Sequence, residues 1–100
     1  MFETWKVLPT NERYKVSNFG RVLDRKDDTI LKPFFEDYYL MVTVMEKVSE
    51  QPKIERITPR YVHNLVADTF LGRKNPNEVV IFKNNKHHMP WASNLKLVKD

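Results

Sequence analysis

The stretch NEVVIFKNNKHHMPWASNLKLV, residues 77–98, decides the fold expected for the C-terminal part of the chain. It contains two short apolar segments, VVIF (79–82) and LKLV (95–98), separated by a long polar connection. Short apolar runs bounded by turn-forming residues are typical of strands. We therefore expect the second segment to pair back onto the first as a β-hairpin.

The residues before this hairpin carry the signals of a helix. In TPRYVHNLVADTFLG, Thr58 is the expected N-cap, and Pro59 occupies the first helical position, where its missing N–H costs nothing. Apolar residues follow at helical spacing, and Gly72 fits the left-handed position that ends many helices. These signals predict a helix over residues 59–71 and a loop from there to the hairpin.

Upstream of the helix, the sequence is typical of short antiparallel strands. YYLMVTVMEKV (38–48) is rich in aromatic and β-branched residues and apolar on both faces, which predicts a central or doubly covered strand. IERIT (54–58) is its expected antiparallel partner. Nearer the start, YKVS and RVLDR are separated by an NFG turn in which Gly20 can adopt positive φ.

Together these elements predict an α+β fold, in which a small antiparallel sheet subdomain is followed by one helix and a β-hairpin. The expected organisation is a strand-rich module over residues 1–57 and a helix-plus-hairpin segment over residues 58–100, forming one compact unit. A chain of 100 residues buries only a modest core, so the expected net stability is several kcal/mol.

Composition narrows the classes of protein to consider. The chain has 17 Lys and Arg against 13 Asp and Glu, which permits phosphate neutralisation on nucleic acid but also fits an ordinary basic surface. The absence of cysteine excludes a disulfide scaffold and thiolate zinc sites. No apolar run approaches the roughly 18 residues of a membrane span, and the start lacks a signal-peptide pattern. We expect no membrane partner and a cytoplasmic location, in the host cytoplasm if the chain is phage-encoded.

Three motifs, in this order, resemble those of phage HNH homing endonucleases. ETWKVLP, YKVSNFGRVLDR and ILKPF resemble the modular DNA-binding motif that accompanies these nucleases. YVHNLVADTF resembles the helix that leads into the HNH site, and VVIFKNNK with SNLKLV resembles the HNH hairpin itself. The resemblance extends over residues 3–98 and implies a strand-rich DNA-binding module followed by a remnant of the ββα-metal motif.

The resemblance also implies that the catalytic positions are altered. The family's metal-binding Asp or Asn corresponds to Ile81, and its general-base His corresponds to Phe82, which has no proton acceptor. The Asp-Gly of the turn corresponds to Asn84 and Asn85, and the Asn that orients the His is retained as Asn94. We therefore interpret the chain as a degenerate HNH protein and not as an enzyme.

Another metal ligand of the family lies on a helix after the hairpin, which would follow Asp100, so the fold is expected to lack this final metal-binding helix. No metal or other cofactor is expected. His87 and His88 are either solvent-facing loop residues or, with a neighbouring amide, a rebuilt metal site. His63 is expected to be a structural hydrogen-bonding residue beneath the hairpin.

Ile81 and Phe82 are interpreted as apolar plugs that convert a polar cleft into core or contact surface. Each adds roughly 1.5–3 kcal/mol of stability if fully covered. Met89, Pro90 and Trp91 lie close by in sequence, where they either seal the end of the hairpin or form an exposed patch for a partner.

Three functions follow from the resemblance and stay open. The first is a phage-encoded, non-catalytic accessory or regulatory protein that binds duplex DNA. The second is an inactive nuclease scaffold that binds and inhibits a host or defence protein, and the third is a weak metal-dependent DNA nickase. The DNA contacts expected for the first are the basic residues Arg21, Arg25, Lys26, Lys32, Lys53, Arg56, Arg60, Arg73, Lys83 and Lys86.

Overall fold

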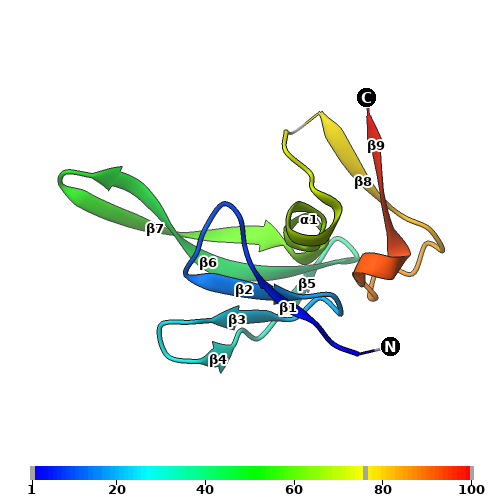
Figure 1. The fold of residues 1–100 in the computed structure, drawn as a ribbon, viewed down its shortest axis with the longest axis horizontal. Coiled ribbons are helices and arrows are strands. Elements are labelled where there is room, and N and C mark those ends of the chain that lie inside the picture. Colours follow the sequence, from blue (N-terminus) through cyan, green and yellow to red (C-terminus); the bar gives the residue numbers. More distant parts are fainter. Residues whose placement is uncertain (1, 76, 100) are drawn as a thin grey trace.

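The protein folds as three small antiparallel sheets around one short helical segment (Figure 1). This computed structural model describes residues 2–75 and 77–99. The α+β class expected from the sequence is confirmed. Among the described residues, no helix is both long and apolar enough to cross a lipid bilayer.

The first sheet contains the short N-terminal strands that the sequence predicted. They are β1 (Trp5–Val7), β2 (Tyr14–Ser17), β3 (Val22–Asp24) and β4 (Thr29–Ile30), paired in sequence order. Val16 of β2 lies opposite Val22 of β3, and both side chains are buried. Alternate residues of a strand share one face, so this pair turns one side of the sheet toward the core.

The second sheet is built on the long apolar strand predicted around residues 38–48. Its strands are β5 (Phe34–Glu36), β6 (Tyr39–Glu50) and β7 (Lys53–Tyr61), and β6 is the central one, as expected. Beyond the core, β6 and β7 continue as a two-stranded projection over residues 46–57, which extends away from the other elements at the left of Figure 1. We call this projection the β6–β7 ribbon.

The helix begins later than the sequence predicted. Residues 59–61 belong to β7, in which Pro59 lies opposite Thr43, and the helix α1 (Val62–Val66) follows with Tyr61 as its N-cap. Thr58 therefore caps no helix. Pro59 is tolerated because β7 is an edge strand, and its missing N–H faces away from β6 in a non-hydrogen-bonded pair. Strand pairing outweighs the Thr-Pro helix signal here.

The end of the helical segment agrees with the sequence. After α1 the backbone continues as a π-helical segment, Ala67–Leu71, and stops at Gly72 in the left-handed conformation with φ 71°. The Thr69 hydroxyl donates to the Leu65 carbonyl at 2.7 Å, which occupies a backbone acceptor where the helical ladder changes. The prediction that Gly72 ends the helical segment is confirmed.

The expected C-terminal hairpin is also present. Strand β8 (Glu78–Phe82) pairs with β9 (Leu95–Lys99), and a 3₁₀ turn (Ala92–Asn94) precedes β9. Phe82 lies opposite Leu95, and both side chains are buried against the rest of the molecule. The connection between the two strands folds back to the N-terminal sheet, which fixes the position of the hairpin.

One apolar core joins all of these elements. Its buried members come from the β1–β2 connection, β2, β3, β6, α1 and the hairpin; they are Leu8, Tyr14, Val16, Val22, Val42, Val44, Val62, Leu65, Val66, Phe82 and Leu95. The boundary expected between the strand-rich module and the helix-plus-hairpin segment, at residues 57 and 58, falls inside β7. This strand pairs with β6 on both sides of that point. No single sheet is large enough to bury a core alone, so each depends on the others.

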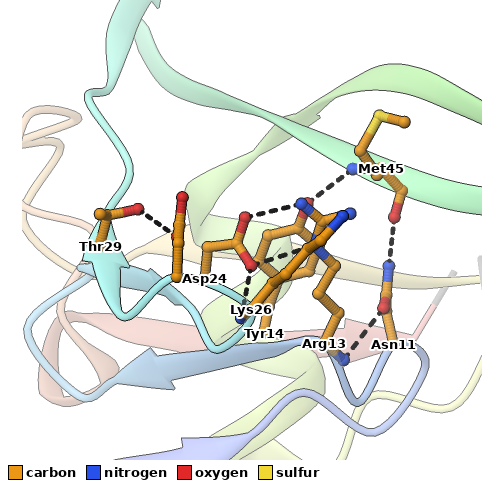
Figure 2. Close-up of polar contacts among 8 residues, drawn as sticks. Asn11, Arg13, Tyr14, Asp24, Lys26, Thr29 and Met45 are labelled. Carbon is orange, nitrogen blue, oxygen red and sulfur yellow. Dashed lines mark hydrogen bonds and ion pairs between the residues drawn. The ribbon is translucent and has the colours of Figure 1, made fainter.

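Two side chains of the N-terminal sheet fasten it to β6 (Figure 2). Strand β5 pairs with β6 only through Met41, so beyond that point the edge of β6 opposite β7 has no strand partner among the described residues. At this edge the Met45 N–H donates to the Tyr14 hydroxyl at 2.7 Å, and the Asn11 amide donates to the Met45 carbonyl at 2.8 Å. The two side chains therefore replace a missing strand.

The NFG turn fastens the same sheet to the C-terminal hairpin. The Ala92 N–H donates to the Asn18 carbonyl at 2.8 Å, and Gly20, with φ 81°, lies directly against Pro90. A Cβ added at Gly20 would lie 2.8 Å from Pro90 Cγ. Ser17 stabilises the turn, because its hydroxyl accepts the N–H groups of Phe19 and Arg21 at 3.1 Å.

Removing the Tyr14 hydroxyl is expected to destabilise the fold. Tyr14→Phe leaves the partly buried Met45 N–H without its acceptor, at a cost of about 1 kcal/mol in the free energy of unfolding. Urea denaturation measures this cost. The matched control is Tyr38→Phe. Because the Tyr38 side chain is exposed, this substitution should leave the free energy of unfolding unchanged. Equal denaturation midpoints for the two variants would contradict this role of Tyr14.

Gly20→Ala and Gly72→Ala form a second matched pair. Both glycines have positive φ, so both substitutions impose a left-handed alanine, which costs about 1–2 kcal/mol. Only Gly20→Ala adds the contact with Pro90, since nothing lies within 4 Å of a Cβ at Gly72. Thermal unfolding should show a larger loss for Gly20→Ala, and an equal loss would show that the close approach is unimportant.

Candidate functional site

Phe82 lies within a cluster of aromatic and imidazole rings at the base of the hairpin. The cluster consists of Tyr39, Tyr61, His63, Phe82 and His87. The Phe82 ring centroid is 5.2 Å from that of His63 and 5.0 Å from that of His87, both edge-on. Phe82 is only 9% exposed, so the sequence interpretation of this residue as an apolar plug agrees with its environment.

Of the two roles left open by the sequence, Ile81 is not part of the core and lies on the surface of the hairpin. Its side chain is 41% exposed, because adjacent residues of a strand face opposite sides and Phe82 takes the inner one. Ile81 instead shares the outer face of the hairpin with Val79 and Val98, which are also exposed. The outer face of this two-stranded sheet therefore exposes these three apolar side chains to solvent beside Lys96, which lies opposite Ile81.

The hairpin turn shows how the remaining expected positions are used. Asn85 has φ 59°, a conformation that favours glycine, and it stands where the resemblance places the Gly of the turn. The Asn84 carboxamide oxygen accepts the Lys86 N–H at 3.0 Å. Asn94 is buried and donates to the Met89 carbonyl at 3.0 Å, so it closes the connection between β8 and β9.

The apolar residues of this connection divide between the two roles left open by the sequence. Pro90 is buried against the NFG turn, which fits a seal at the end of the hairpin. Trp91 is partly exposed and packs on Phe19, with 5.1 Å between ring centroids. The connection is thus mainly a structural bridge to the N-terminal sheet.

The two loop histidines differ in environment. His87 is half-buried, with its ring centroid 4.7 Å from that of Tyr39, whereas His88 is exposed. Within the described residues no group of three or more His, Cys, Asp or Glu side chains is placed to hold a metal ion. The rings packed against His87, those of Tyr39 and Phe82, supply no imidazole or carboxylate ligand of the kind that divalent cations prefer.

His63 lies beneath the hairpin as expected, but the expected hydrogen bond is wrong for its Nδ1 atom. This nitrogen is buried and has no partner among the described residues. Burial, followed by the positive charge of Arg73 and the proximity of His87, lowers the pKa of His63 to about 4. The imidazole is therefore neutral near neutral pH, held by rings on several sides.

The predicted DNA-contacting residues are exposed or partly exposed, but several are engaged within the chain. Arg21 forms a two-pronged ion pair with Glu3, at 2.8 and 2.6 Å, and its pairing lowers the pKa of Glu3. Arg60 pairs in the same way with Glu46. Arg60 and Arg73 also line a cleft of about 670 Å³ in which Glu46, Asp68 and Glu12 balance the positive charge.

A different hollow gathers positive charge. It measures about 650 Å³, lies between the N-terminal sheet and the β6–β7 ribbon, and is called the basic groove below. Five basic residues and two carboxylates line it, together with Asn11 and Met45; the charged residues are Arg13, Arg25, Lys26, Lys47, Lys53, Glu12 and Glu55. Three of them, Arg25, Lys26 and Lys53, were predicted DNA contacts.

Arg13 and Lys47 were missed by the sequence prediction. Arg13 holds the buried carboxylate of Asp24 with two hydrogen bonds of 3.0 and 2.9 Å, and this pairing lowers the pKa of Asp24 (Figure 2). The same carboxylate accepts the Lys26 N–H at 3.0 Å, which fixes the turn that carries Lys26. No sequence signal marks Arg13, because its place in the groove depends on the packing of two sheets.

The other predicted contacts lie apart from this groove. Lys32 precedes β5, Arg56 lies on the β6–β7 ribbon, and Lys83 and Lys86 lie in the connection after β8. All four side chains are exposed. The structure therefore brings three of the predicted basic residues together and leaves the remainder distributed over the surface.

Comparisons with known proteins agree with the motifs in the sequence. Residues 3–45 match the NUMOD4 motif. The chain is 31% identical over 101 aligned residues to "Uncharacterized HNH endonuclease L247" of Acanthamoeba polyphaga mimivirus, covering 91% of this chain and 24% of that protein. The chain thus spans about a quarter of the length of this curated relative.

A solved structure shares the fold. It is described as "DNA binding and cleavage by the HNH homing endonuclease I-HmuI", and it superposes with a TM-score of 0.78 at 24% identity. The match covers 96% of this chain and 52% of that one. The likeness to HNH homing endonucleases and to their modular motif, expected from the sequence, is confirmed.

His63 is expected to make the stability of the fold depend on pH. Its pKa is about 4 when folded against an ordinary 6.5, so the unfolded chain takes up a proton first as the pH falls. Stability is therefore full above pH 6.5 and falls toward pH 4, by up to about 3 kcal/mol. Urea denaturation between pH 7 and 5 measures this loss before most carboxylates titrate.

The matched variants are His63→Phe, which keeps a ring in the cluster, and His88→Ala, which removes an exposed imidazole. His63→Phe should flatten the dependence on pH over this window, whereas His88→Ala should preserve it. A dependence that survives in His63→Phe would assign the effect to another group.

Proposed function

Because this chain is HNH-like and carries the NUMOD4 motif, we propose that it binds duplex DNA through the basic groove without catalysing its cleavage. The observation that carries the proposal is the convergence of Arg25, Lys26 and Lys53 in one hollow. Phosphate neutralisation by Lys and Arg supplies most of the affinity of such interfaces. The accessory or regulatory role anticipated from the sequence is part of this proposal.

The electrostatics of the groove support an anionic ligand. Its five basic side chains exceed its two carboxylates, whereas the neighbouring cleft around Arg60 is charge-balanced. Arg13 is paired with Asp24 and Lys47 with Glu50, whereas among the described residues Arg25 is held only by one bond to the Glu12 carbonyl at 2.6 Å, so Arg25, Lys26 and Lys53 keep charge to meet phosphate. The carboxylates at the rim restrict where a phosphate can approach.

The shape of the molecule supports a duplex. The β6–β7 ribbon projects from one side of the groove and carries the exposed Arg56. A two-stranded ribbon of this kind fits the major groove of B-DNA, which is about 12 Å wide. The groove and the ribbon together would contact the backbone and the base edges of one duplex.

The absence of catalysis is proposed from the hairpin. In the register implied by the family resemblance, the position of the general base is Phe82, whose ring offers no proton acceptor. The left-handed Asn85 supports this register, because the turn glycine falls there. His87 lies beside Phe82, but its ring packs on hydrocarbon and lacks the carboxylate that orients a general base among the described residues.

Binding to duplex DNA is tested by fluorescence anisotropy at several salt concentrations. If three phosphates are contacted, affinity should fall by about 40-fold between roughly 50 and 200 mM salt, because the slope is about −0.9 per phosphate. Arg25→Gln, Lys26→Gln and Lys53→Gln should each weaken binding and reduce the slope by about one. Lys96→Gln, an exposed lysine outside the groove, is the matched control.

Two outcomes would count against the proposal. If no binding is detected at low salt, duplex DNA is excluded as a partner. If Lys96→Gln and the groove variants lose affinity equally, the basic groove is excluded as the binding site. Incubation of supercoiled plasmid with Mg²⁺ or Mn²⁺ tests the nickase alternative, and nicking that disappears in His87→Ala would show a rebuilt active site.

A second candidate function rests on the outer face of the hairpin. Val79, Ile81 and Val98 form an exposed apolar surface, which is unusual for a two-stranded sheet and favours a protein partner. Ile81→Lys would abolish such binding and leave DNA affinity unchanged. The Ile81→Lys variant therefore separates binding and inhibition of a protein partner from binding of DNA.

A further inference from the structure

A hollow of about 460 Å³ opens between the β5–β6 turn and the connection after β8. Its lining combines two aromatic rings, two imidazoles and one carboxamide; the residues are Phe35, Tyr38, Asn85, His87 and His88. We call it the aromatic hollow. None of these residues lines the basic groove, and the volume lies in the range of about 300–1,000 Å³ typical of small-ligand sites.

The floor of this hollow is preorganised. The His87 ring lines it and is held from behind by Tyr39, at 4.7 Å between centroids, and by Phe82, at 5.0 Å. Phe82 is itself locked in the core, so the platform is rigid before any ligand arrives. A rigid ring binds a planar ligand without losing rotamer freedom at that moment.

The walls of the hollow are aromatic side chains that the fold leaves in solvent. Tyr38 is 84% exposed and Phe35 is 61% exposed. The turn that presents them has φ 49° at Asp37 and 74° at Tyr38, a left-handed pair for which Asn-Gly is the usual sequence. A bulky tyrosine in this conformation costs stability that glycine would not, which indicates a role outside folding.

The chemistry of the lining indicates a nucleobase. Flat aromatic and imidazole rings stack on bases of any sequence, and the carboxamide of Asn85 and the nitrogens of His88 can bond to base edges. Lys83 and Lys86, exposed on the same connection, supply positive charge nearby. Glu36 and Asp37 lie on the turn and disfavour a phosphate there, so the base, not the backbone, fits over it.

We propose that the aromatic hollow receives an unstacked nucleobase of bound DNA, with Tyr38, Phe35 and the His87 ring as its stacking surfaces. The inference rests on the proposed function for its natural setting, because the basic groove would hold the flanking duplex. It adds a preferred substrate, DNA that contains an unpaired or easily extruded base.

The experiment compares three probes of one sequence: a fully paired duplex, the same duplex with a single bulged 2-aminopurine, and the single strand. The protein should bind the bulged duplex roughly 5- to 160-fold more tightly than the paired one, the range for loss of one stacked base. The fluorescence of 2-aminopurine, which stacking quenches, should fall on binding.

The variants separate the hollow from the rest of the surface. Tyr38→Ala and Phe35→Ala should lower the affinity for the bulged duplex to that for the paired one and leave the latter unchanged. Ile30→Ala, an exposed apolar residue of β4 that lines neither the aromatic hollow nor the basic groove, is the matched control and should alter neither. Tyr38→Gly should raise the thermal midpoint while it abolishes the preference, which excludes unfolding as the cause.

Each outcome is decisive for one of the two proposals. Equal wild-type affinity for bulged and paired duplex, or a preference that survives Tyr38→Ala, would overturn the nucleobase site and leave the duplex proposal standing. If the paired duplex is not bound at all, the proposed function fails. The nucleobase site is then tested by the 2-aminopurine fluorescence of the single strand. Quenching that needs Tyr38 would then support the hollow, and no quenching would exclude it.

Discussion

The structure depends on the way Tyr14 and Asn11 complete the open edge of β6. A backbone N–H and carbonyl at a buried strand edge need partners, and here a hydroxyl and a carboxamide from the N-terminal sheet supply them at Met45 (Figure 2). Because both bonds end on one residue, they fix the orientation of two sheets that share no strand pairing. Asn11 and Met45 also line the basic groove, so the contact that joins the sheets also sets the spacing of its charges.

The second fastening, between Gly20 and Pro90, connects the start of the chain to its C-terminal hairpin. A two-stranded hairpin is only marginally stable alone, and this one is held by Phe82 and Leu95 in the shared core and by the NFG turn at its connection. The motif residues Ser17, Asn18 and Gly20 thus have a structural explanation. They shape a turn that receives the hairpin, and they need not contact DNA themselves.

Phe82 links the altered hairpin to both proposals. A polar residue at this buried position would need a hydrogen-bond partner, and one ring nitrogen beside it, His63 Nδ1, already has none among the described residues. A phenyl ring there packs without that penalty and supports the ring of His87. The phenyl ring of Phe82 therefore forms a firm surface beside the hairpin, which is the basis for the proposed stacking site.

The sequence by itself determined the class of fold, the central strand, the Gly72 terminus, the pairing of VVIF with LKLV and the likeness to HNH proteins, because these depend on local patterns and motif order. Only the tertiary structure decided that Pro59 lies in a strand, that Ile81 faces solvent and that the His63 Nδ1 atom has no hydrogen-bond partner among the described residues. Strand pairing set the first two outcomes, since the β6–β7 register overrides a local helix signal and the pleat lets only one of two neighbouring residues face inward. The basic groove and the aromatic hollow were likewise beyond the sequence, because each joins side chains from segments that meet only when the sheets pack together.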